Sequence, residues 1–357
     1  MQDCLKLTVY FGERKRVGGR FVADGLLDLF GHHEIATSVL LRGVEGFGLK
    51  HHLRTDSSLT LSEDLPAVAV AVDTRERIKA LVSDATELTS SGLVTLERAR
   101  MQTGELDRSS LPEEFDEATK LTVYLGRQER VYRVPAFVAV CDLLHRRGLA
   151  GATVLLGVDG TAHGQRERAR FVGRNANVPM MVIAVGRGDQ IARVLPELGG
   201  LLRRPLITLE RVRICKRDGE VLGTPHPLPS TDENGMALWQ KLMVYNSESA
   251  LHNGQPIHRA ITRQLRKSRA AGSTTLRGTW GFHGDQAPHG DRALQLGRRV
   301  PTLTIVIDTP QRITESFAII DELTTEGGLV TSEMVPALRA TTGRKQRGGT
   351  RLANFRY

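Results

Sequence analysis

Lys120-Leu-Thr-Val-Tyr124 decides the fold, because the chain contains nearly the same five residues three times. One copy precedes it at Lys6-Leu-Thr-Val-Tyr10, and another follows it at Lys241-Leu-Met-Val-Tyr245. The spacings that separate these copies also relate three pairs of glycines: Gly43 and Gly46, Gly157 and Gly160, and Gly278 and Gly281. A register held over about forty residues in three copies is an internal repeat, so one module is used three times.

The first copy predicts the elements of that module. Residues 5–11 alternate apolar and polar side chains at period two, as a half-buried strand does. Residues 21–33 carry apolar side chains on one side of a helix, and a second helix begins with the capping-box pair Asp73 and Glu76. Further strands are predicted at 36–43, 67–72 and 93–99. The order is βαββαβ, a ferredoxin-like unit of the α+β class.

The repeat also sets the domain boundaries. Three units are predicted, joined by linkers rich in Pro, Gly, Asp and Ser and followed by a basic tail. The tail has no apolar periodicity, so we expect it to be disordered. The units span 1–104, 119–214 and 237–336, the linkers span 105–118 and 215–236, and the tail spans 337–357.

One strand indicates how the units assemble. Ala67-Val-Ala-Val-Ala-Val72 is apolar on both sides, as a strand covered on both faces would be. The two helices of a unit cover only one face of its sheet, so the other face needs a partner. The economical arrangement is a closed ring that mimics a homotrimer. We therefore expect a monomeric, intramolecular pseudo-trimer with three clefts between units.

Composition narrows the class of protein. The net charge is +9, but the tail from Arg339 onward carries six basic residues and no acid, so the rest is nearly balanced. Three widely spaced cysteines fit neither a disulfide framework nor a zinc pattern and favour a reducing cytoplasm. No signal-peptide pattern and no membrane-spanning apolar run is evident. No nucleophile elbow or Walker loop occurs, so we predict no enzyme, no catalytic residue, no metal and no bound cofactor.

Three stretches carry a family resemblance. Lys6-Leu-Thr-Val-Tyr10, Leu41-Arg-Gly-Val-Glu-Gly46 and Leu61-Ser-Glu-Asp-Leu-Pro66 resemble the PII-like proteins of domain-of-unknown-function family 190. The second and third units keep the spacing of these motifs but lack the Ser-Glu-Asp sequence. Three units in one chain also depart from the family, whose members usually have a single domain. The resemblance implies a trimer that binds an effector, an adenine nucleotide in PII proteins, between subunits. It also implies long loops that dock onto transporters or enzymes.

The glycine pairs are the first candidate ligand site. Gly43 and Gly46, and their counterparts Gly157, Gly160, Gly278 and Gly281, open the long loop in each unit. Glycine lets backbone amides approach a phosphate as an anion nest. The alternative is a strand-to-loop turn that needs glycine for structural reasons.

Arginine pairs are the second candidate. In the first two units, the glutamate at the end of the last strand is followed by two arginines at alternate positions, so both lie on the same side of the strand. The resemblance implies that these arginines contact nucleotide phosphates. The third unit has Glu333-Met-Val-Pro336 instead, so its cleft is expected to be deficient. The pairs are Arg98 and Arg100, and Arg211 and Arg213.

The long loops and the strand ends supply the remaining candidates. The loops 47–64, 161–177 and 282–299 are basic and contain histidine, which suits either phosphate binding or a solvated surface. On the neighbouring first and last strands of each unit we expect structural pairs: Lys6 with Glu97, Lys120 with Glu210, and Lys241 with Glu333.

Three functions remain open from sequence. The leading one is a non-enzymatic PII-like regulator that binds a small anionic effector between units and docks a transporter, channel or enzyme through its loops. An RNA-binding protein is the second, because RNA-recognition motifs share this topology, but stacking aromatics are missing from 67–72 and from 180–185, which leaves the basic tail. The third is a structural adaptor without a ligand.

Overall fold

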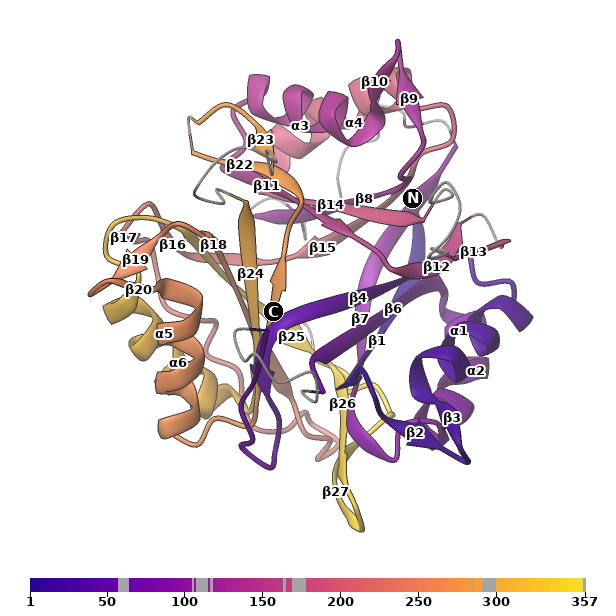
Figure 1. The fold of residues 1–357 in the computed structure, drawn as a ribbon, viewed down its shortest axis with the longest axis vertical. Coiled ribbons are helices and arrows are strands. Elements are labelled where there is room, and N and C mark those ends of the chain that lie inside the picture. The colour runs from indigo at the N-terminus through magenta and orange to yellow at the C-terminus, as the bar shows by residue number, and fades with distance from the viewer. Residues whose placement is uncertain are drawn as a thin grey trace.

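The computed structural model describes residues 1–56, 64–104, 106, 115, 118–162, 165–168, 178–284, 286–290 and 300–355, with side chains of 162–168 excepted. In this part of the chain it has six helices, and the strands pair antiparallel. Figure 1 shows the strands around the centre and three pairs of helices on the outside. The protein is therefore a mixed α/β protein of three similar units.

The first unit has the predicted element order. Its sheet runs β4-β6-β1-β7, and its buried core lies between this sheet and α1 and α2. The short hairpin β2–β3 precedes α1. The bounds are β1 (Gln2–Gly12), β2 (Arg16–Val17), β3 (Arg20–Phe21), α1 (Val22–His32), β4 (Thr37–Phe47), β6 (Pro66–Thr74), α2 (Arg75–Glu87) and β7 (Ser91–Thr103).

The other two units repeat this plan. Unit 2 contains β8 (Thr119–Gly126), β9 (Arg130–Val131), β10 (Val134–Pro135), α3 (Ala136–Arg146), β11 (Gly151–Leu156), β14 (Pro179–Gly186), α4 (Gly188–Leu201) and β15 (Leu206–Arg211). Unit 3 contains β18 (Trp239–Ser247), β19 (Leu251–His252), β20 (Gln255–Pro256), α5 (Ile257–Lys267), β21 (Ser273–Arg277), β24 (Pro301–Asp308), α6 (Pro310–Leu323) and β25 (Leu329–Val335).

Strand pairing between units runs in a circle. The end of β4 in unit 1 pairs with β21 of unit 3. In the same sense β12 (Asp159–Ala162) of unit 2 pairs with β4 of unit 1, and β22 (Trp280–His283) of unit 3 pairs with β11 of unit 2. The short strands β5 (Arg54–Thr55), β13 (Gln165–Arg168) and β23 (His289–Gly290) complete these hairpins.

A second circle forms at the ends of the last strands. The end of β7 pairs with β15 of unit 2, and β16 (Arg213–Arg217) pairs with β25 of unit 3. The chain after unit 3 returns to the start, because β26 (Ala337–Thr342) pairs with β7 of unit 1. The hairpin partners β17 (Glu220–Val221) and β27 (Lys345–Gly349) lie beside β16 and β26.

The inner sheet faces share one apolar core. Buried side chains from all three units form it, including Val70, Ile183 and Ile305. Each unit has a separate core beneath its own helices. This explains why residues 67–72 are apolar on both sides: one side meets α1 and α2, and the other meets the shared core.

The tail and one linker differ from the sequence-based prediction. Residues 337–357 were expected to be disordered, yet they contain β26 and β27, and Ala353 is fully buried. Backbone pairing with β7 orders a segment that has little apolar periodicity of its own. The linker 215–236 likewise begins with the β16–β17 hairpin. Most of the linker 105–118 lies outside the described residues.

Candidate functional site

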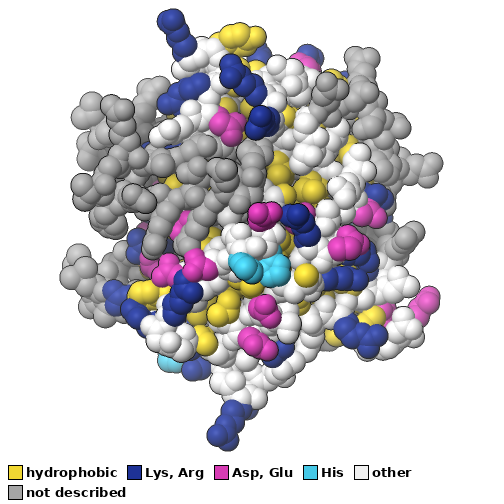
Figure 2. All heavy atoms as spheres, turned by 90° about the vertical axis from the view of Figure 1, so that its right-hand side faces the viewer, with side chains coloured by type: hydrophobic (Ala, Val, Ile, Leu, Met, Phe, Trp, Pro, Cys, Tyr) yellow, Lys and Arg dark blue, Asp and Glu magenta, His cyan; other side chains and the backbone are white. Residues whose placement is uncertain are grey.

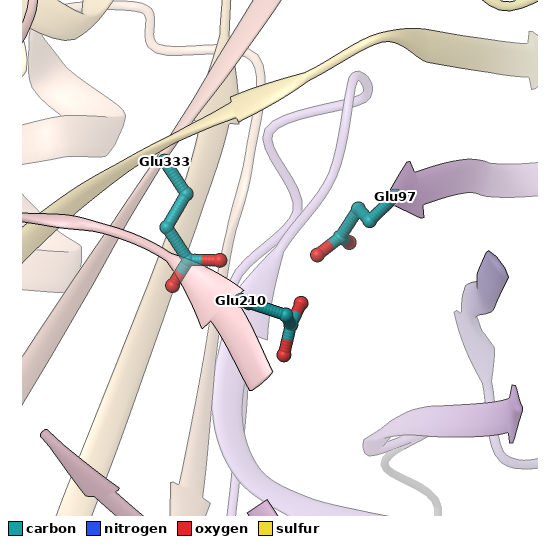
Figure 3. A group of neighbouring side chains, drawn as sticks. All are labelled: Glu97, Glu210 and Glu333. Atoms are coloured by element: carbon teal, nitrogen blue, oxygen red, sulfur yellow. The ribbon is translucent and has the colours of Figure 1, made fainter. Parts of the chain in front are cut away.

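The lysines and glutamates of the repeat form a ring at the centre of the molecule. Each lysine contacts the glutamate of its own unit and that of another unit, so the pairing is wider than expected from sequence. Figure 3 shows the three carboxylates converging from their strands. The ring runs Lys6–Glu97 (2.8 Å), Glu97–Lys241 (2.5 Å), Lys241–Glu333 (2.9 Å), Glu333–Lys120 (2.5 Å), Lys120–Glu210 (3.2 Å) and Glu210–Lys6.

Burial and mutual attraction oppose each other in this ring. Burial alone would raise the pKa of Glu97, but Lys241 and Lys6 outweigh it and hold that pKa well below its usual value. Burial would lower the pKa of Lys6, and Glu210 and Glu97 instead raise it. One carboxylate oxygen from each glutamate lies within 4.8 Å of those of the other two, a spacing that could hold a metal ion. Three ammonium groups already balance their charge, so the arrangement is a structural ion network.

The second glycine of each pair lies where two units meet. A Cβ on Gly46 would lie 2.5 Å from the carbonyl oxygen of Ser273, and one on Gly160 would lie 2.2 Å from that of Ser38. A Cβ on Gly281 would lie 2.2 Å from the carbonyl oxygen of Ala152. Glycine is therefore needed for close strand approach between units, which accounts for this half of the motif without a ligand.

The first glycines lie against the proline that opens the third strand. The amides of Gly157 and Gly278 donate to the carbonyl oxygens of Pro179 and Pro301, so they are occupied within the protein. A Cβ on Gly43 would lie 2.7 Å from the Pro66 side chain. The anion-nest role of the glycine pairs remains a prediction that nothing in this geometry requires.

The arginine pairs lie at the inter-unit strand ends. Arg98 donates to the carbonyl oxygen of Ala353 in the tail, at 2.5 Å, and Arg100 pairs with Asp3. Arg211 ends β15, and Arg213 begins β16. None of these four lines either of the cavities described next.

A cavity of about 280 Å³ lies between units 1 and 3. Its walls come from the β4–β5 hairpin, the start of unit 3's second strand, and the β26–β27 hairpin. The apolar lining includes Phe47, Trp239, Ile305 and Leu338. The charged lining consists of Lys15, Lys50, Arg54, Asp64 and Arg347, with His52 beside them.

A corresponding cavity between units 3 and 2 is much smaller, at about 30 Å³. It is lined by Tyr245 and Pro301, in the register of Tyr10 and Pro66, and its titratable side chains are His283 and His289. The cleft beside the third unit's extension was expected to be deficient, because the arginine pair is missing there. That extension is β26, and the larger cavity lies beside it.

The basic residues and histidines of the long loops lie in different environments. Lys50, His52 and Arg54 line the larger cavity, whereas His51 lies against the Phe47 ring. In unit 2, Arg166 and Arg168 lie on β13, but their side chains are not described, nor are residues 163–164 and 169–177. Residues 291–299 of unit 3 also lie outside the described residues.

Sequence reasoning missed Trp239, Lys15 and Arg347. Trp239 had a detectable signal, because in the register of the repeat it replaces Ala118 and Cys4 with a large aromatic side chain. Arg347 was assigned to the disordered tail.

A polar cluster fastens the β4–β5 hairpin to unit 3. Glu45 is 4% exposed and lies 3.9 Å from the Arg259 guanidinium of α5. Asp56 pairs with Arg277 at 3.1 Å. Burial raises the pKa of Glu45 to about 7, although Arg259 opposes the shift. Burial lowers the pKa of the neighbouring His258 to about 4, and Arg259 adds to that effect.

The sequence matches the DUF190 family model, described as an uncharacterized ACR, three times. The matched residues are 4–101, 118–214 and 239–337. These matches cover most of the chain and coincide with the three units. The protein belongs to the DUF190 family. This PII-like family favours a regulatory role, and the three matches confirm the tandem repeats inferred from Lys120-Leu-Thr-Val-Tyr124.

Proposed function

We propose that the chain is a PII-like regulator whose three ferredoxin-like units form an intramolecular pseudo-trimer. Two circles of inter-unit strand pairing and the six-membered ion ring support the closed arrangement. The family membership supports the regulatory role.

A small anionic effector, with an adenine nucleotide as the first candidate, binds in the cleft between units 1 and 3. The observation that carries this proposal is the cavity of about 280 Å³, with an apolar floor and four cationic side chains around it. Small-molecule sites combine an apolar lining with a few polar groups and have volumes of roughly 300 Å³ or more. The cavity is just below that range and suits one small ligand.

Effector binding is transmitted through the loop of unit 1. Residues 46–50 and Arg54 line the cavity and belong to the β4–β5 hairpin, which leads into the long loop ending at Asp64. A ligand that binds one arrangement of this hairpin more tightly shifts the population of loop conformations. The loop then engages a transporter, channel or enzyme as partner. The protein acts without catalysis, as a monomer in the cytoplasm.

Equilibrium calorimetry with ATP, ADP, AMP and cyclic nucleotides tests the proposal. We expect saturable binding of at least one adenine nucleotide by the whole chain. Lys50→Gln should weaken it, whereas Lys79→Gln, which neutralises an exposed lysine on α2, should not. Flat traces at millimolar concentrations of every nucleotide would contradict effector binding.

RNA binding has less support than this. The basic tail that was expected to hold RNA pairs with β7 and contributes Leu338 and Ala340 to the shared core. Figure 2 shows basic and acidic side chains interspersed on the face that carries α1 and α2. A phosphate backbone is held by clustered basic side chains, and the pattern on this face differs from that. The role of a ligand-free adaptor does not account for the cavity.

A further inference from the structure

We propose that the cleft between units 1 and 3 is built for a phosphate monoester dianion on a planar ring, and that Arg347 of β27 is the residue that responds to it. The inference rests on the proposed effector site and names its ligand class and its responsive element. It concerns the chain's last hairpin, β26–β27, which has no counterpart of the same sequence after units 1 and 2.

Charge balance sets the ligand class. Four cations line the cavity: Lys15, Lys50, Arg54 and Arg347. Arg54 pairs with Asp64 at 3.1 Å, and Arg347 lies 3.6 Å from Asp308. Among the described residues no carboxylate pairs with Lys15 or Lys50, so the described part of the wall holds two cations without an acidic partner. A phosphate monoester carries close to two negative charges at neutral pH and would complement them.

The apolar floor calls for a ring beside the phosphate. Phe47, Trp239, Ile305 and Ile307 lie on that floor, and Tyr10 and Leu93 lie on the side formed by unit 1. A free inorganic anion would leave this apolar surface in contact with water, whereas a nucleobase would cover it. In the corresponding cavity of about 30 Å³ between units 3 and 2, the described lining residues include no lysine or arginine.

Arg347 links the cavity to the end of the chain. Its guanidinium carbon lies 4.7 Å from the centre of the Trp239 ring, while the nearest Asp308 oxygen lies 3.6 Å away. All of β27, including Arg347, is exposed, and it pairs with β26. A phosphate in the cavity offers Arg347 a bidentate, charge-assisted partner at shorter range than Asp308 does. Arg347 then moves relative to Trp239, and β27 moves with it.

The two tryptophans make the movement measurable. The chain contains Trp239 in the larger cavity and Trp280 on β22 beside Phe137, and no other tryptophan. In the Trp280→Phe chain, emission reports on Trp239 alone, and in the Trp239→Phe chain it reports on Trp280 alone. We expect AMP to change the emission of the Trp280→Phe chain saturably and to leave that of the Trp239→Phe chain unchanged.

The variants and probes separate the parts of the proposal. In the Trp280→Phe chain, adenosine and inorganic phosphate should each bind at least tenfold more weakly than AMP. Arg347→Gln should weaken AMP at least tenfold, and Lys345→Gln, an equal charge change two residues away on β27, should not. Both side chains are exposed, so the variants test binding without disturbing the core.

The outcomes distinguish this inference from the function on which it rests. If calorimetry detects AMP but Trp239 emission and the Arg347→Gln affinity do not change, the inference is overturned and effector binding stands. If phosphate alone binds as tightly as AMP, the role of the ring is overturned. If no nucleotide binds by calorimetry, both are overturned.

Discussion

The clefts on the two sides of unit 3 are formed by equivalent strands but differ in volume and in the side chains that line them. One is a cavity of about 280 Å³ with lysines and arginines in its wall, and the other is about 30 Å³ with two histidines. In both, the second glycine of the repeated pair, Gly46 or Gly281, allows strands of adjacent units to approach closely. In three separate identical subunits, a change in one cleft would be a change in all. A single chain can keep its common centre and specialise one cleft.

The largest expected effect concerns what the clefts share. Lys120→Met removes one ammonium group from the ring and leaves Glu210 and Glu333 with too little positive charge in a buried position. We expect the free energy of unfolding to fall by about 3–5 kcal/mol, as for other buried pairs that lose one partner. Chemical denaturation measures this. Glu87→Gln, on the exposed side of α2, should change it by less than about 0.5 kcal/mol.

The glycines distinguish the two clefts. Gly46→Ala and Gly281→Ala each force a Cβ against a backbone oxygen of the adjacent unit, and each should cost about 1–3 kcal/mol of stability. Only Gly46→Ala should also weaken AMP binding, because Gly46 lines the larger cavity. Gly327→Ala has no neighbour within 4 Å and serves as the control. Equal loss of AMP binding in both variants would show that the clefts are not specialised.

The polar cluster beside the larger cavity predicts two opposing pH dependences of the free energy of unfolding. The pKa of Glu45 rises from 4.5 to about 7 on folding, so its contribution to stability is present below about pH 4.5 and is lost as pH rises through 7. The pKa of His258 falls from 6.5 to about 4, so its contribution changes in the opposite direction, rising between about pH 4 and 6.5. The two contributions largely cancel in the parent chain.

Removing either group should reveal the other. Relative to the parent chain, Glu45→Gln should gain stability as pH rises from 5 to 7.5, by about 1–2 kcal/mol, and His258→Gln should lose it over pH 4.5 to 6.5. Denaturation at a series of pH values measures both slopes. Parallel curves for all three chains would mean that neither group changes its pKa on folding.

The smallest effect compares the hairpin turns before the first helices. The turn residues have positive φ in all three units, at Gly18 and Gly19, at Asn253 and Gly254, and at Tyr132 and Arg133. Asparagine and glycine suit this turn, whereas a bulky side chain is strained there. Replacing Tyr132 and Arg133 by Asn and Gly should therefore raise the free energy of unfolding by about 1 kcal/mol. A loss of stability would count against the strained turn.

The repeat made the secondary structure and the Lys–Glu pairing accessible to sequence reasoning. Period-two and helical patterns depend on local burial, so strand 5–11 and helix 21–33 were predicted within a few residues of β1 and α1. The contacts of Lys6 with the glutamates of two units required the closed circle of strands. So did the order in the tail, because β26 is stabilised by a strand more than two hundred residues earlier in the chain.

The candidate site was predictable only in part. Lys50, His52 and Arg54 belong to the loop 47–64, which was a candidate site because it is basic and contains histidine, and they line the larger cavity. Arg98 and Arg100 were selected by resemblance. They contact the tail and the N-terminal strand, and their contact with a ligand stays a prediction. The volume and lining of a cavity depend on which side chains of two units face each other. No single stretch of sequence contains that information.

The specialisation of one cleft is tested most directly by a crystal soaked with 8-bromo-AMP and measured at the bromine absorption edge. The account predicts an anomalous peak among Phe47, Trp239 and Ile305, between units 1 and 3, with the phosphate beside Lys50 and Arg347. A peak beside Tyr245 and His283, or equal peaks in both clefts, would contradict it.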